Sequence, residues 1–190
     1  MKYLFIFLLT CLISSVSAGN PDDTTYVLTN SYEGIIWGKN YPLNCLNIDT
    51  TKRWNPTVED IAKAEIILKK YMDKTGLKAE KVLKRHSSKK KVKQMLAKNP
   101  LVATGHFPTE FLAKYIYKDL ENYVRQYMGD IDNKNRKILY IQCTSKQELY
   151  KFPYWETETI CMLGGGTTSY WRWFIKVDIK RKKAFDFLPN

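Results

Sequence analysis

The basic side chains between residues 78 and 98 are the densest group of charges in the sequence. Nine lysines and arginines lie there against one acid, Glu80, so the segment has a net charge of +8. Three of these residues, Lys89, Lys90 and Lys91, are consecutive. Side chains that neutralise several phosphates or sulfates bind polyanions with an affinity that falls steeply with salt. We expect these three lysines to contact an anionic surface or polymer, and the alternative is a solvated segment that keeps the protein soluble.

A catalytic base and nucleophile would have to combine His106 with a cysteine. His106 lies in a loop between Gly105 and Pro108, where a side chain can reach a cleft. Cys143 or Cys161 would supply the thiol. No local signature of a cysteine hydrolase surrounds these residues, so a hydrogen-bonded loop histidine is the alternative to a hydrolase.

Cys143 and Cys161 also suit a disulfide. Both lie in expected strands, which we place next to each other, and disulfides form in exported proteins. The alternative is that these cysteines, with Cys45, are buried as small apolar residues.

Acidic side chains suggest no metal site. Glu156 and Glu158 alternate with threonines and would share one strand face, where they are either an acid–base pair or the solvated side of the strand. Asp49, Asp130 and Asp132 lack the spacing of a calcium loop. We therefore expect no metal and no cofactor.

Two aromatic residues are candidate contact residues. Trp155 ends a Phe-Pro-Tyr-Trp sequence in a loop, and we expect it to be partly exposed. Tyr170 follows the three glycines at 164–166, which predict either a flexible hairpin loop or a loop that contacts a partner. Exposed loops of this kind also suit an inhibitor that inserts a loop into a protease.

The N-terminus predicts export. Residues 1–18 combine a basic start, an apolar run and small residues before Gly19, the pattern of a signal peptide cleaved near Ala18. The apolar run is too short for a stable transmembrane segment. A lipid attached at Cys11 is the alternative. We expect a periplasmic or secreted protein that meets no cytoplasmic nucleic acid.

Periodicity predicts one helix followed by strands. A helix over 57–75 begins with Thr57 as its cap, carries an apolar stripe and ends at Gly76. The stretch 32–54 is expected to be irregular, and the basic segment 77–99 forms either short helices or a mobile insert. A second helix is expected over 111–120. Strands are expected at 24–29, 122–131, 137–144, 157–163 and 170–179, with a last strand near the C-terminus.

These elements predict a single α+β domain over residues 19–190. One long helix in the N-terminal half packs on a curved antiparallel sheet of four to five strands. This order of elements resembles the cystatin-like and NTF2-like folds. Trp54 to Thr57, Arg125-Gln126-Tyr127 before Gly129, and the ending from Tyr170 to Asp178 resemble small exported bacterial proteins of unassigned function.

The function that these features favour is non-enzymatic binding. The ligand would be held by the concave sheet face or by the hairpin loops, and the partner would be an anionic surface or polymer, or a secreted protein. Inhibition of a secreted protease by loop insertion is the second hypothesis, and a hydrolase that uses His106 is the third.

Overall fold

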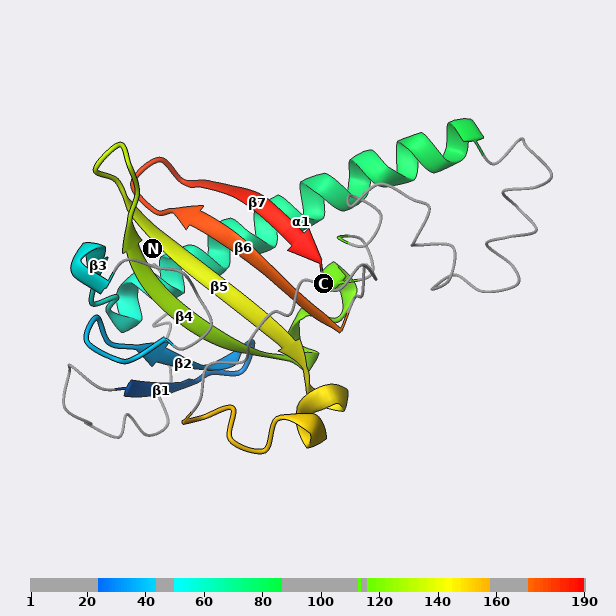
Figure 1. Ribbon diagram of the computed structural model, residues 1–190. Coiled ribbons are helices and arrows are strands. Elements are labelled where there is room, and N and C mark those ends of the chain that lie inside the picture. Colours follow the sequence, from blue (N-terminus) through cyan, green and yellow to red (C-terminus); the bar gives the residue numbers. More distant parts are fainter. Residues whose placement is uncertain (1–23, 44–49, 87–112, 114–115, 158–170, 190) are drawn as a thin grey trace, which may run out of the picture.

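Among the residues that the structure describes, seven strands form one open sheet and a 29-residue helix covers one of its faces (Figure 1). The computed structural model describes residues 24–43, 50–86, 113, 116–157 and 171–189. The helix is α1 (Val58–His86). The strands are β1 (Thr24–Leu28), β2 (Glu33–Trp37), β3 (Arg53–Trp54), β4 (Tyr123–Ile131), β5 (Lys137–Ser145), β6 (Arg172–Asp178) and β7 (Lys183–Pro189). Short 3-10 helices occupy Thr50–Lys52, Leu120–Asn122 and Lys146–Lys151.

The sheet is mixed. Its strand order is β1-β2-β4-β5-β6-β7, and β3 pairs with β4 off this path. β2 runs parallel to β4, whereas the other pairs are antiparallel. The α+β class is confirmed, but the expected sheet of four to five antiparallel strands was wrong. The stretch 32–54, expected to be irregular, contains β2 and β3.

Gly34 shows why β2 was missed. Glycine is usually rare in strand interiors because it weakens them. Here a Cβ atom at position 34 would lie 2.4 Å from the Arg125 carbonyl oxygen and 2.8 Å from the Tyr127 ring. Gly34 therefore allows the close approach of β2 to β4, and it does not break the strand.

The start of α1 is as the sequence predicts, and its end is not. The Asp60 amide donates to Thr57 Oγ1 at 3.2 Å, and the Thr57 amide donates to Asp60 Oδ2 at 3.0 Å, a reciprocal cap. The expected end at Gly76 was wrong, because the helix continues to His86. A glycine ends a helix by adopting a positive φ, and no described glycine has one.

The apolar stripe of α1 packs on the sheet as expected. Ile61, Ala64, Leu68 and Met72 are fully buried. They join the side chains that β4, β5 and β6 direct to this face: Tyr127, Leu139, Ile141, Cys143, Trp173, Ile175 and Val177. The alternation in β6 and the hairpin between β4 and β5 are confirmed. Of the second helix expected at 111–120, only Ala113 and residues 116–118 are described as helical.

Candidate functional site

Five lysines and no acid line a groove between α1 and β7. Lys70, Lys74 and Lys78 come from the helix, and Lys182 and Lys183 come from the β6–β7 turn and the start of β7. The groove has a volume of about 430 Å³. Its other lining residues are mostly apolar: Ile66, Ile67, Tyr71, Thr75 and Ala184. We name these five lysines and the hollow between them the lysine groove.

The helix fixes the spacing of the first three lysines. Residues four apart on a helix lie on one side and are separated by about 6 Å along its axis. The buried stripe of α1 is turned toward the sheet, so Lys70, Lys74 and Lys78 remain exposed beside it. Among the residues that the structure describes, none of the five groove lysines forms an ion pair with an acid. In this part of the chain, no acidic side chain therefore neutralises their charges.

The β6–β7 turn fixes the other wall. The Lys182 amide donates to the Ile179 carbonyl at 3.2 Å, and Lys182 has a left-handed φ of 52°. The Arg181 amide donates to Asp178 Oδ1 at 2.9 Å, and the Asp178 side chain is 3% exposed. Left-handed backbone is uncommon for a residue with a side chain, so the surrounding contacts hold it.

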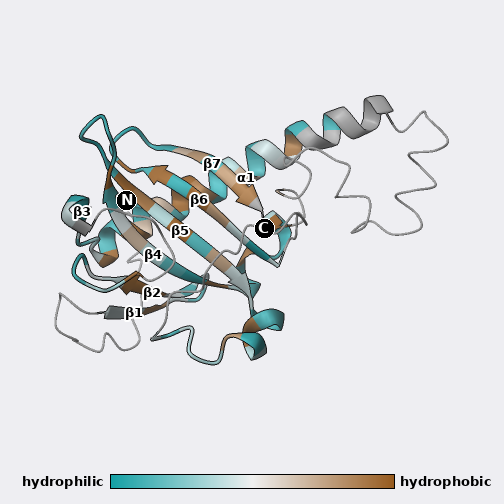
Figure 2. Cartoon of the chain, in the orientation of Figure 1, coloured by the Kyte–Doolittle hydropathy of each residue, from teal (hydrophilic) through white to brown (hydrophobic). Residues whose placement is uncertain are grey.

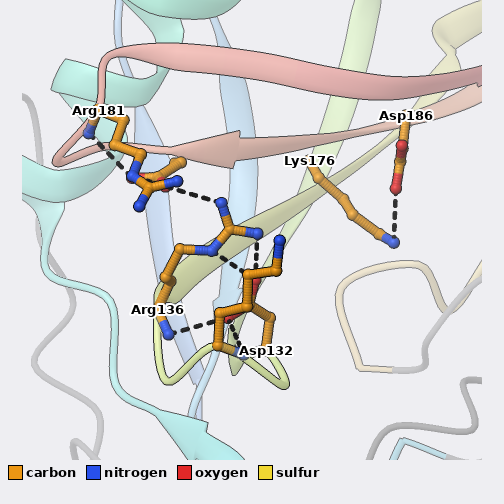
Figure 3. Close-up of polar contacts among 7 residues, drawn as sticks. Asp132, Arg136, Lys176, Arg181 and Asp186 are labelled. Atoms are coloured by element: carbon orange, nitrogen blue, oxygen red, sulfur yellow. Dashed lines mark hydrogen bonds and ion pairs between the residues drawn. The ribbon is translucent and has the colours of Figure 1, made fainter.

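The β4–β5 turn supports the β6–β7 turn through an ion-pair chain (Figure 3). Arg136 binds Asp132, with its amide 2.9 Å from Oδ1 and its Nε 2.6 Å from Oδ2. On its other side, Arg136 Nη1 lies 3.8 Å from Asp178 Oδ2, and Arg181 Nε lies at the same distance from that oxygen. We name Asp132, Arg136, Asp178 and Arg181 the turn clamp. Both turns are hydrophilic (Figure 2), and the clamp joins them.

The turn clamp predicts an acid-dependent loss of stability. Hydrogen bonds from Arg136 lower the pKa of Asp132 from 3.8 to about 2. A carboxyl whose pKa is lower in the folded chain stabilises the fold above its unfolded pKa, and this contribution disappears as the pH falls through the folded value. We expect the stability difference between wild type and Asp132→Asn to shrink as the pH falls from about 4 to about 2. Urea unfolding midpoints measured across this range test the prediction, and a constant difference contradicts it.

A larger cleft beside the turn clamp is a weaker candidate. Its volume is about 780 Å³, and its lining includes Lys134, Lys137 and Lys180 together with Asp60 and all of the turn clamp except Asp132. The clamp arginines face Asp178, and Lys137 Nζ lies over the Trp54 ring at 5.1 Å. Several basic side chains of this cleft therefore already contact other protein groups, whereas the lysines of the lysine groove do not pair with an acid.

A buried polar cluster joins α1 to β4. Arg125 Nε lies 2.9 Å from Glu65 Oε1, and the Tyr127 hydroxyl donates to the same oxygen at 2.8 Å. Arg125 also donates to the carbonyls of Tyr123 at 2.7 Å and Leu120 at 3.0 Å. The guanidinium is surrounded by protein acceptors, so this cluster fixes the helix on the sheet.

Cys143 lies on the helix side of β5 and is fully buried. Burial raises the pKa of its thiol well above the usual value. A cysteine nucleophile needs an accessible thiolate, so this environment does not favour the nucleophile role. Cys143 has a free thiol, and its neighbours in the sheet are Arg125 on β4 and Trp173 on β6. Cys161 lies outside the described residues, so its pairing with Cys143 stays a prediction.

Trp155 was expected to be partly exposed, and this prediction was wrong. Its side chain is 8% exposed and packs with Ile35, Trp37 and Val124 in a second core on the sheet face opposite α1. Gln126 Nε2 donates to the Trp155 carbonyl at 2.8 Å. The loop that contains Trp155 therefore covers part of the sheet face opposite α1.

Most of the other predicted site residues lie outside the described residues. These are Lys89, Lys90, Lys91, Tyr170, His106 and Glu158, and Glu156 lies in an exposed turn. The lysine groove was not predicted from the sequence. The spacing of Lys70 and Lys74 beside the apolar stripe was the available signal. Lys182 and Lys183 offered none, since only the fold brings them to α1.

Comparisons with known proteins do not assign the chain. No family model matches it, and no match was found to a curated protein or a solved structure. Among the described residues, no three His, Cys, Asp or Glu side chains are grouped to hold a metal ion. No helix in this part of the chain is long and apolar enough to cross a membrane.

Proposed function

We propose that this chain is an exported, non-enzymatic binding protein for an anionic partner, which it holds in the lysine groove. The observation that supports this function is the composition of the groove, with five lysines and no acid among its lining residues. Concentrated charge of one sign attracts and retains the opposite charge, especially where the walls face each other. Export rests on the signal peptide pattern of residues 1–18.

The fold supports this proposal by making one wall of the groove rigid. The turn clamp and the hydrogen bond from Lys182 to Ile179 hold the β6–β7 turn. In our proposal this turn contributes to binding, although the sequence pointed to other loops. The helix across an open sheet also supports a cystatin-like or NTF2-like arrangement, extended by the parallel β2–β4 pair.

Replacing Lys70, Lys74 and Lys78 together with glutamine tests the proposal. Exposed charge pairs contribute about 0.2–1 kcal/mol each, so we expect affinity for a heparin column to fall about tenfold. The variant should elute at lower salt, and its affinity should depend less steeply on salt. Glutamine is a good helix former, so α1 should remain folded.

Three exposed lysines outside the groove provide the matched control. Replacing Lys39, Lys118 and Lys134 with glutamine removes the same charge, and this variant should elute close to wild type. Equal shifts for both triple variants would show that net charge alone determines retention, and the groove would be rejected. A Lys89/Lys90/Lys91→Glu variant in the same assay measures what that part of the basic segment contributes.

Inhibition of a secreted protease is the second proposal, and one observation favours it. In the loop 146–157, Tyr150 and Tyr154 are 76% and 65% exposed, whereas Trp155 anchors the loop in the second core. An anchored loop with exposed aromatic tips is suited to insertion. Such activity would be unaffected by the groove substitutions, so an inhibition assay on that variant separates the two proposals.

A further inference from the structure

Two large aliphatic side chains are exposed on α1. Ile66 is 71% exposed and Leu77 is 52% exposed. They are 11 residues apart, which is close to three helical turns, so they point in nearly the same direction about 16 Å apart. Single exposed hydrophobic residues are common and need no explanation. Two on one line of one helix, in a strongly basic setting, form a surface with both apolar and charged character.

Exposed lysines surround these two residues. Lys70 and Lys74 lie between them along the helix, and Lys63 and Lys81 lie one turn beyond each end. Lys63 also forms an exposed ion pair with Glu59 at 3.8 Å. Asp73 is the one acid between Ile66 and Leu77. We name the outward side of α1 with Ile66, Leu77 and these four lysines the outer face.

The outer face is exposed in the part of the chain that the structure describes. Leu68 and Met72, which pack on the sheet, are fully buried, while Ile66 and Leu77 lie on the other side of the helix. Figure 1 shows α1 running diagonally behind the sheet and extending beyond it. A flat partner can therefore lie along α1 while the sheet remains on the opposite side.

We infer that the anionic partner is a lipid surface, on which α1 lies parallel to the plane through its outer face. The lysines bind the lipid phosphates, and Ile66 and Leu77 enter the boundary between the headgroups and the acyl chains. A sulfated or phosphorylated polymer offers no apolar layer that would bury these two side chains. This inference rests on the proposed function, because the same helix supplies Lys70 and Lys74 to the lysine groove.

The test measures sedimentation of the protein with phosphatidylcholine vesicles, with and without phosphatidylglycerol. Each basic residue near an anionic surface contributes roughly fivefold to partitioning. Wild type should bind only the vesicles that contain phosphatidylglycerol. A Leu77→Ser variant, at a residue that does not line the lysine groove, should bind them about fivefold less, yet elute from heparin at the salt of wild type. The Lys70, Lys74 and Lys78 variant should lose affinity for both.

Leu28 supplies the matched apolar control, since it is 39% exposed and lies on β1, at the opposite edge of the sheet from β7. A Leu28→Ser variant should bind vesicles as wild type does. All variants share the same N-terminal segment, so its contribution cancels in each comparison.

The outcomes separate this inference from the proposed function. If the Leu77→Ser variant binds vesicles like wild type while the lysine variant binds heparin more weakly, the lipid inference is overturned and polyanion binding stands. If the serine variant also elutes from heparin at lower salt than wild type, the aliphatic side chain does not act on lipid alone, and the inference is again overturned. If the lysine variant binds both heparin and vesicles as tightly as wild type does, the proposed function itself fails.

Discussion

Gly34→Ala should destabilise the protein by about 3 kcal/mol, the upper part of the range for overpacked cores. The added Cβ would lie 2.4 Å from the Arg125 carbonyl oxygen, a backbone atom that cannot rotate away. Alanine also reduces the freedom of the unfolded chain, which stabilises the fold by only about 0.4–1 kcal/mol. The steric clash is the larger effect, so β2 must move away from β4.

Thermal unfolding measures this effect. For a chain of this size, each kcal/mol shifts the Tm by about 2–4 °C, so the Tm should fall by roughly 6–12 °C. Ser31→Ala, at an exposed position three residues earlier, is the control and should change stability by less than about 0.5 kcal/mol. A Tm for Gly34→Ala equal to that of wild type would mean that β2 and β4 do not pack this closely.

Arg125→Met should destabilise the protein by about 3–5 kcal/mol, the usual loss when one partner of a buried ion pair is removed. The substitution leaves Glu65, whose side chain is 11% exposed, without its positive partner. It also removes the donors that reach the carbonyls of Tyr123 and Leu120. Methionine has a similar length and fills the space, so the loss reports mainly on the charge and the hydrogen bonds.

A double variant and an exposed ion pair make this prediction specific. Arg125→Met combined with Glu65→Gln removes both charges and should recover part of the lost stability in chemical denaturation. Lys63→Met removes the exposed pair with Glu59 and should change stability by less than about 1 kcal/mol. Equal losses for Arg125→Met and Lys63→Met would be incompatible with a buried role for Arg125.

The elements that the sequence predicted correctly are set by local patterns. The alternation of Trp173, Ile175 and Val177 with more exposed residues defines β6, and the reciprocal cap of Thr57 and Asp60 defines the start of α1. The polar turn between β4 and β5 lies where its residues predicted it. Each of these features depends on side chains a few residues apart.

The elements that were missed depend on distant residues. Gly34 was interpreted as a strand breaker. The reason for a glycine at position 34 is the close approach of Arg125 and Tyr127 on β4, which lie far away in the sequence. Trp155 was expected to be partly exposed because it lies in a loop, and its burial depends on residues of β2 and β4. The lysine groove likewise joins Lys74 and Lys182, which are 108 positions apart in the sequence. No local pattern contains such pairs.

The parallel pairing of β2 with β4 also governs the order in which this protein can fold. Glu33 aligns with Val124, 91 positions later, so β1 and β2 leave the ribosome long before the strand that completes their sheet. An isolated two-stranded hairpin is only marginally stable in water. The N-terminal strands therefore stay unpaired on one edge until β4 has been synthesised, and pairings between such distant segments form slowly. During this interval the apolar residues Ile35, Ile36 and Trp37 are accessible to chaperones. Without a bound chaperone, these residues favour aggregation.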